Sequence, residues 1–186
     1  VVERFVVTQA KNLATNQMDA ALAAYAQALP LDKALLPELR LAAEELWPFA
    51  LGMRAAHLAQ HAPAAGVEAA GAIKALYGAK GLPADLWNAV CWYASLYGQA
   101  SGALPFCETA LERDPGNPSI LDSRGLARAL TGNLAGAAED FRVFVEATKK
   151  TGRYDTLGKL REGWVARLEK GENPFDAAVI EALRKE

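Results

Sequence analysis

The chain has 186 residues, of which 52% are hydrophobic and 23% charged, and a formal net charge of −2. This composition is that of an ordinary soluble protein, long enough for one domain or one array of repeats. A charge so close to zero argues against nucleic acid as the main ligand, which would need a basic face. No run of 18 apolar residues occurs, so we expect no membrane-spanning helix and no membrane partner.

Helical periodicity runs along the whole chain, and no stretch of alternating β-branched residues predicts a strand. About a fifth of the residues are alanine, the best helix former. Breaks at Gly, Pro and Asn divide the pattern into helices, in this order: 2–14, 18–29, 37–47, 49–61, 66–78, 84–97, 100–113, 118–130, 134–150, 154–169 and 176–184.

Several helix ends have recognisable signals. Gly98 and Gly132 follow apolar runs and are typical of turns between paired helices. Residues 114–118 read Asp-Pro-Gly-Asn-Pro, a strong break, and Pro118 suits the first turn of the next helix. Asp176 is placed as an N-cap. The first residues, 1–5, carry neither Met nor a signal-peptide pattern, so we expect the sequence to be a piece of a longer protein.

Short loops between helices of about a dozen residues force antiparallel neighbours, and such pairs bury their faces only by stacking. A shift of about 34 residues brings two segments into register. The matched pairs include Leu96 with Leu130, Gly98 with Gly132, Ala103 with Ala137, Cys107 with Phe141, and Glu112 with Glu146.

These segments resemble the tetratricopeptide repeat (TPR) family, whose pattern is W-x2-L-G-x2-Y, then A-x3-F, then P. The first copy has Trp87, Val90, Cys91, Ala94, Ala103, Cys107 and Pro115 at these places. The second has Leu121, Arg124, Gly125, Arg128, Ala137 and Phe141. A looser match contains Phe5, Ala21, Tyr25 and Ala28. The resemblance implies an all-α, right-handed superhelix of antiparallel helix pairs with a C-terminal capping helix.

We therefore expect four regions along the chain. Residues 1–35 form a degenerate TPR-like hairpin, and 36–83 an irregular helical pair with a connecting helix. Residues 84–151 hold two TPR repeats, and 152–186 the C-terminal capping helices.

The resemblance also implies a binding face, since the first helix of each hairpin lines a concave groove in this family. The corresponding residues here are Asn88, Trp92, Ser95, Asp122, Leu126 and Ala129. Trp92 is the best single anchor, because Trp is enriched among interface hot spots. It could instead pack against the helix at 66–78. Asp122 would repel the acidic chaperone tails that some family members bind.

Arg124 and Arg128 lie four apart on one helix face, where the family usually has Leu and Tyr. Buried cations need partners. They either bridge to Glu139, Asp140 or another nearby acid, or grip a carboxylate of a partner.

The sequence gives little support for catalysis or metal binding. Two cysteines, Cys91 and Cys107, make no disulfide framework, so we expect small buried residues and a reducing cytoplasm. His57 and His61 share a helix face, yet no third ligand lies nearby in sequence. No nucleotide-binding or nucleophile motif occurs. We predict no enzyme, no cofactor and no metal.

The main prediction is a protein–protein interaction scaffold, a bacterial cytoplasmic module of a larger protein that binds a peptide or helix, or restrains an attached domain. One alternative is a homo-oligomerisation module, which exposure of Trp164 or Phe175 would favour. A less favoured one is a small metal or catalytic domain around His57 and His61.

Overall fold

The computed structural model describes residue 49 and residues 51–185. The chain separates into two compact units, 1–50 and 51–186, and the helices given below belong to the second. The predicted hairpin at 1–35 and the helix at 37–47 lie outside the described residues. The region boundaries predicted at 83/84 and 151/152 fall within the second unit and stay predictions.

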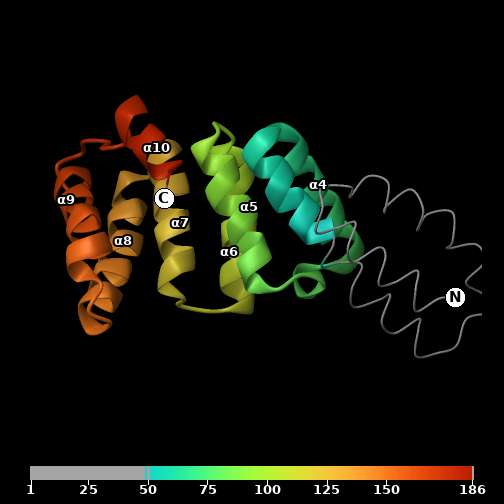
Figure 1. Cartoon of the computed structure of the whole chain (residues 1–186), viewed down its shortest axis with the longest axis horizontal. Helices are drawn as coiled ribbons and strands as arrows, with labels where there is room; N and C mark the ends of the chain where they lie inside the picture. The colour runs from blue at the N-terminus through green and yellow to red at the C-terminus, as the bar shows by residue number, and fades with distance from the viewer. Residues whose placement is uncertain (1–48, 50, 186) are drawn as a thin grey trace, which may run out of the picture. The chain divides into compact units, whose positions relative to one another are not determined.

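Every regular element of the described residues is a helix (Figure 1), so the all-α prediction is confirmed there. After a helical stretch at 51–61, the elements are α4 (Pro63–Tyr77), the short 3-10 turn η2 (Ala79–Gly81), α5 (Ala84–Leu96), α6 (Ala100–Arg113), α7 (Pro118–Leu130), α8 (Leu134–Lys150), the π turn η3 (Tyr154–Gly158), α9 (Lys159–Leu168) and α10 (Ala177–Leu183). None of the helices in this part of the chain is long and apolar enough to cross a membrane.

The predicted helix ends match closely because their local signals work as expected. Gly98 and Gly132 adopt φ of 88° and 90°, the left-handed region that favours glycine in tight turns. Pro118 opens α7, and the Asp176 carboxylate accepts a hydrogen bond from Val179 N at 2.9 Å. Two elements depart: α4 begins three residues early, because Pro63 already fits a first turn, and the helix predicted over 154–169 is divided into η3 and α9.

The helices pack in the order of the sequence. Each of α5, α6, α7 and α8 packs against the helix that follows it. In addition, α5 packs against α7, the first helix of the following hairpin. Figure 1 shows this row from α4 to α9 along the long axis. Such stacking is what hairpins that bury one face require. The right-handed superhelix stays a prediction.

Apolar side chains form two main clusters. We call the first core the one between residues 51–61, α4, α5 and α6, where Trp87 stacks on Phe106 with ring centroids 5.8 Å apart. We call the second core the one formed by α7, α8, α9, the end of α5 and the C-terminal segment; its members include Leu96, Leu126, Phe141, Trp164, Phe175 and Leu183. Each core lies between helices that follow one another in the row, as expected where neighbouring hairpins stack.

Helix α9 packs on the second core through one apolar stripe. Trp164, Val165 and Leu168 are buried there. Leu160 of the same helix is 49% exposed, and Arg161 is buried. The capping role of α9 stays a prediction.

Candidate interaction site

The predicted groove residues lie on α5 and α7, but most of them do not face solvent. Asn88 and Trp92 are half-buried. Ser95, Asp122, Leu126 and Ala129 are buried. Their expected exposure in an open groove is therefore not found, and their binding role stays a prediction.

The chain's own C-terminal segment covers this face. Asn173 Nδ2 donates a hydrogen bond to the carbonyl of Ala129 at 2.9 Å, and the Arg184 guanidinium donates two to the carbonyl of Leu96 at 2.8 and 3.2 Å. These carbonyls end α7 and α5, where a helix leaves acceptors without intrahelical partners. The segment thus binds to the C-terminal ends of α7 and α5.

Apolar anchors complete this contact. Leu183 is 2% exposed and belongs to the second core. The Phe175 ring lies 4.8 Å from that of Trp164 and 5.8 Å from that of Phe141, centroid to centroid. Such aromatic pairs contribute beyond their buried area. Because Phe175 and Trp164 are both buried, the exposure that would have favoured self-assembly is not observed.

Trp92 packs against the second core. The buried α4 residues Ala70 and Ile73 belong instead to the first core, so this assignment does not support the alternative of packing on the helix at 66–78. Trp92 therefore stands beside the face that the C-terminal segment covers.

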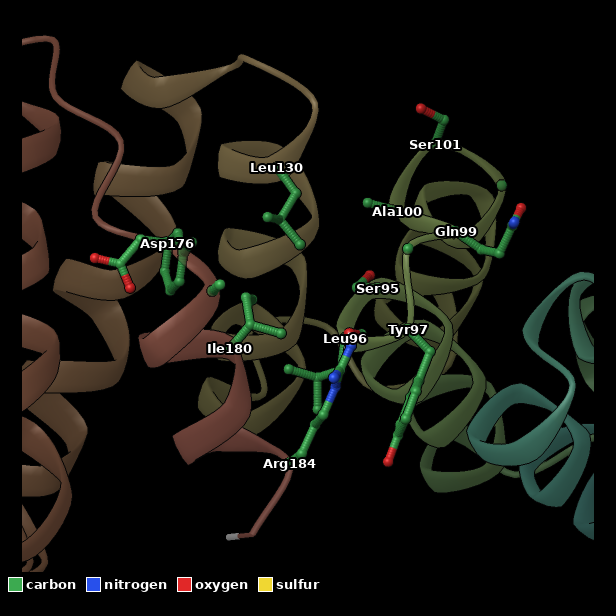
Figure 2. A pocket seen from close by; sticks show the side chains of 14 residues that line it. Ser95, Leu96, Tyr97, Gln99, Ala100, Ser101, Leu130, Asp176, Ile180 and Arg184 are labelled. Atoms are coloured by element: carbon green, nitrogen blue, oxygen red, sulfur yellow. Dashed lines mark hydrogen bonds between the residues drawn. The ribbon is translucent and has the colours of Figure 1, made fainter.

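A pocket of about 640 Å³ opens between the α5–α6 turn, the end of α7 and α10. Figure 2 shows Leu130 and Ile180 on one side and Tyr97 with Gln99 on the other. Its two charged groups are already engaged, since Asp176 caps α10 and Arg184 lies 4.6 Å over the Tyr97 ring. The pocket offers apolar surface and amide or hydroxyl groups suited to holding a side chain.

Arg124 and Arg128 have intramolecular partners. Arg124 forms a two-pronged bond to the Asp140 carboxylate at 2.7 and 2.9 Å, and Arg128 reaches the same carboxylate at 3.0 Å. The bond to Asp140 is the main reason that the pKa of Arg124 is raised. Glu108 adds a contact at 2.8 Å to Arg124. The bridging interpretation is thus confirmed, with Asp140 rather than Glu139 as the acid.

Asp122 is likewise paired, with Arg161 of α9 at 3.2 Å. Arg161 also lies 4.8 Å over the Trp164 ring. Sequence reasoning missed this pair, because the two residues are 39 positions apart and a charged residue on an amphipathic helix is ordinarily solvent-exposed. The bridge ties α9 to α7.

Cys91 and Cys107 form a disulfide, with their Cα atoms 5.1 Å apart. Burial was predicted correctly, but the expectation of two unpaired thiols is wrong. The stacking of α5 on α6 places the two positions opposite each other, within the span that a disulfide requires.

The remaining candidates for catalysis or metal binding do not form a ligand set among the described residues. His57 and His61 have ring centroids 4.4 Å apart, and no group of three metal-binding side chains occurs among the described residues. The Ser95 and Ser123 hydroxyls each donate to a carbonyl of their own helix. The hydroxyl of each serine is therefore satisfied within its own helix, as is common for serine in helices.

Comparisons with known proteins find a likeness over part of the chain. No family model matches it, and no solved structure matches either. Over 91 residues it is 35% identical to a human protein described as FK506-binding protein-like, a match that covers 48% of this chain. The match spans about a quarter of that protein's length, 24%. This likeness concerns a segment and leaves the family of the chain open.

Proposed function

We propose that this chain is a protein-interaction scaffold whose binding face is formed by α5 and α7, the first helices of its two hairpins, as in TPR-type modules. One observation carries the proposal. The face is already contacted by the short helix α10 and its flanking residues, through apolar anchors and through hydrogen bonds to the carbonyls of Ala129 and Leu96.

The anchors define the chemistry of the partner. Leu183 and Phe175 enter the second core, and Arg184 supplies donors to Leu96 O. A partner helix with a leucine followed by an arginine at its end, and an aromatic residue just before its N-cap, would make the same contacts. This partner is another protein or another part of the same longer chain.

Displacement of α10 is compatible with its size. A helix of seven residues is too short to be stable by itself in water. Of its residues, Leu183 alone is buried. Its position depends on a few anchors, so a longer helix with the same anchors would compete with it.

The proposal is tested with a fluorescent peptide that carries residues 172–185 of this chain, added to the wild-type protein and to a Leu183→Asp variant. The variant frees the face, so we expect it to bind the peptide at least tenfold more tightly than the wild type, measured by fluorescence anisotropy. A peptide carrying the same Leu183→Asp change is the control and should bind neither.

Circular dichroism must show that the variant keeps its helices. An Arg184→Ala variant, which leaves the buried Leu183 in place, provides a milder opening if Leu183→Asp unfolds the protein. If the folded variants bind the peptide no better than the wild type, α10 is a permanent cover and this face is not a ligand site.

A further inference from the structure

The disulfide occupies a place that the neighbouring hairpin fills in another way. Cys91 and Cys107 are 16 residues apart, and a shift of about 34 residues carries them onto Gly125 and Phe141, also 16 apart by subtraction. In this second hairpin the Phe141 ring lies directly over Gly125, where an added Cβ would come within 3.0 Å of the ring. The two pairs therefore occupy equivalent positions between the two helices of a hairpin.

The two solutions differ in what holds the helices together. Phe141 is fully buried and contacts the rings of Trp164 and Phe175, so the second hairpin depends on apolar burial. The cysteines are also fully buried, but the cluster around them is small, with Ala127 as its other buried member and Leu104 packed against it. Among the described residues, no aromatic ring belongs to this cluster, so the covalent bond joins the two helices at this point, while Trp87 and Phe106 join them in the first core.

We propose that the Cys91–Cys107 disulfide replaces the glycine–aromatic contact of the neighbouring repeat, and that this chain folds and works in an oxidising compartment. The bond forms when the two thiols lose two electrons and two protons to a disulfide oxidant, which becomes a dithiol. This inference does not depend on the proposed binding function.

Burial protects the disulfide from reduction. Thiol–disulfide exchange requires a thiolate to reach one of the sulfur atoms, and both cysteines are fully buried. A reductant therefore reaches the bond only when α5 and α6 separate. The expectation of a cytoplasmic location was based on unpaired thiols, and the disulfide removes that basis, because such bonds persist mainly outside reducing cytoplasm.

The test compares the wild type with two double variants, with and without dithiothreitol. One variant, Cys91→Gly with Cys107→Phe, installs the pair of the second hairpin. The other, Cys91→Ala with Cys107→Ala, removes the bond and fills the space poorly. Thermal unfolding is followed by circular dichroism, and alkylation with mass spectrometry counts free thiols in each wild-type sample.

We expect reduction to lower the wild-type Tm by about 10 °C. The alanine variant should unfold near the reduced wild type, and the glycine–phenylalanine variant near the oxidised wild type, both without response to the reductant. Wild type exported to a bacterial periplasm should contain no free thiols and should be recovered in at least several-fold higher folded yield than from the cytoplasm. The glycine–phenylalanine variant should show no such difference.

Two results would overturn the inference. One is a wild type whose Tm is unchanged although alkylation shows both thiols free, since the bond would then contribute nothing. The other is a glycine–phenylalanine variant that is no more stable than the alanine variant or does not fold, since the two positions would then not be equivalent.

Discussion

Asp140 binds two arginines from the preceding helix at once, and its own side chain is almost entirely buried. Replacing it with asparagine would leave Arg124 and Arg128 as partly buried cations whose contact with a carboxylate is that to the exposed Glu108. Breaking a buried ion pair from one side is costly. We expect Asp140→Asn to lower the free energy of unfolding by about 3 kcal/mol in urea denaturation.

The neighbouring acid gives a matched control. Glu139 is exposed, so Glu139→Gln should change the free energy of unfolding by less than about 0.5 kcal/mol. Equal losses in the two variants would mean that net charge, and not the bridge to the two arginines, is the cause.

Two helical glycines with opposite surroundings test packing at the same scale. A Cβ at Gly163 would meet nothing within 4 Å, whereas one at Gly125 would press on Phe141. Phe141 is held between Trp164 and Phe175, so it has little room to move. Gly163→Ala should therefore raise the free energy of unfolding by about 0.5–1 kcal/mol, and Gly125→Ala should lower it. Thermal melts compare both with the wild type, and a gain at Gly125 would contradict the proposed close packing.

At the scale of elements, the junction between α8 and α9 is a π turn that the sequence does not announce. The periodicity predicts one helix over 154–169, and its bounds are nearly right. The turn depends on a distant contact, because a Cβ at Gly158 would come within 2.1 Å of Thr148 Oγ1. Helix signals are local, so a feature set by packing against α8 escapes them.

A polar network on this junction makes stability depend on pH. The Tyr154 hydroxyl donates to the Glu162 carboxylate, and Lys149 lies 3.2 Å from the same group. The tyrosine bond, followed by the lysine, holds the pKa of Glu162 below its ordinary value of 4.5. A carboxyl group with a lowered folded-state pKa contributes stability above its unfolded pKa and loses it as the pH falls through the folded value.

Glu162→Gln should therefore have a lower Tm than the wild type at neutral pH, and the difference should stay constant down to about pH 5 and close below it. Thermal melts between pH 7 and pH 3 measure the two curves. Glu112→Gln is a suitable control, since it removes the charge of an exposed glutamate outside this network. A difference between Glu162→Gln and wild type that persists undiminished at pH 3 would show that the carboxylate charge is not responsible.

For the whole molecule, the repeat spacing and the turn glycines were enough to predict the hairpins, because each signal is local. The cover over the predicted groove was beyond such reasoning, since Asn173 and Arg184 contact carbonyls 44 and 88 residues earlier in the chain. The disulfide lay within reach of the repeat comparison. Cys91 and Cys107 align with Gly125 and Phe141, and the expectation of unpaired thiols came from cysteine number alone.

A stacked array with two cores should lose stability locally, because each repeat contacts only its neighbours. Phe141→Leu removes ring contacts in the second core and should increase amide hydrogen exchange across α7 to α10 while changing α4 much less. Trp87→Phe in the first core should give the reverse pattern. Mass spectrometry of exchanged peptides resolves the two regions. A uniform rise across 51–185 in both variants would mean that the helices unfold as one cooperative unit, and the description as an array of semi-independent hairpins would then have to be abandoned.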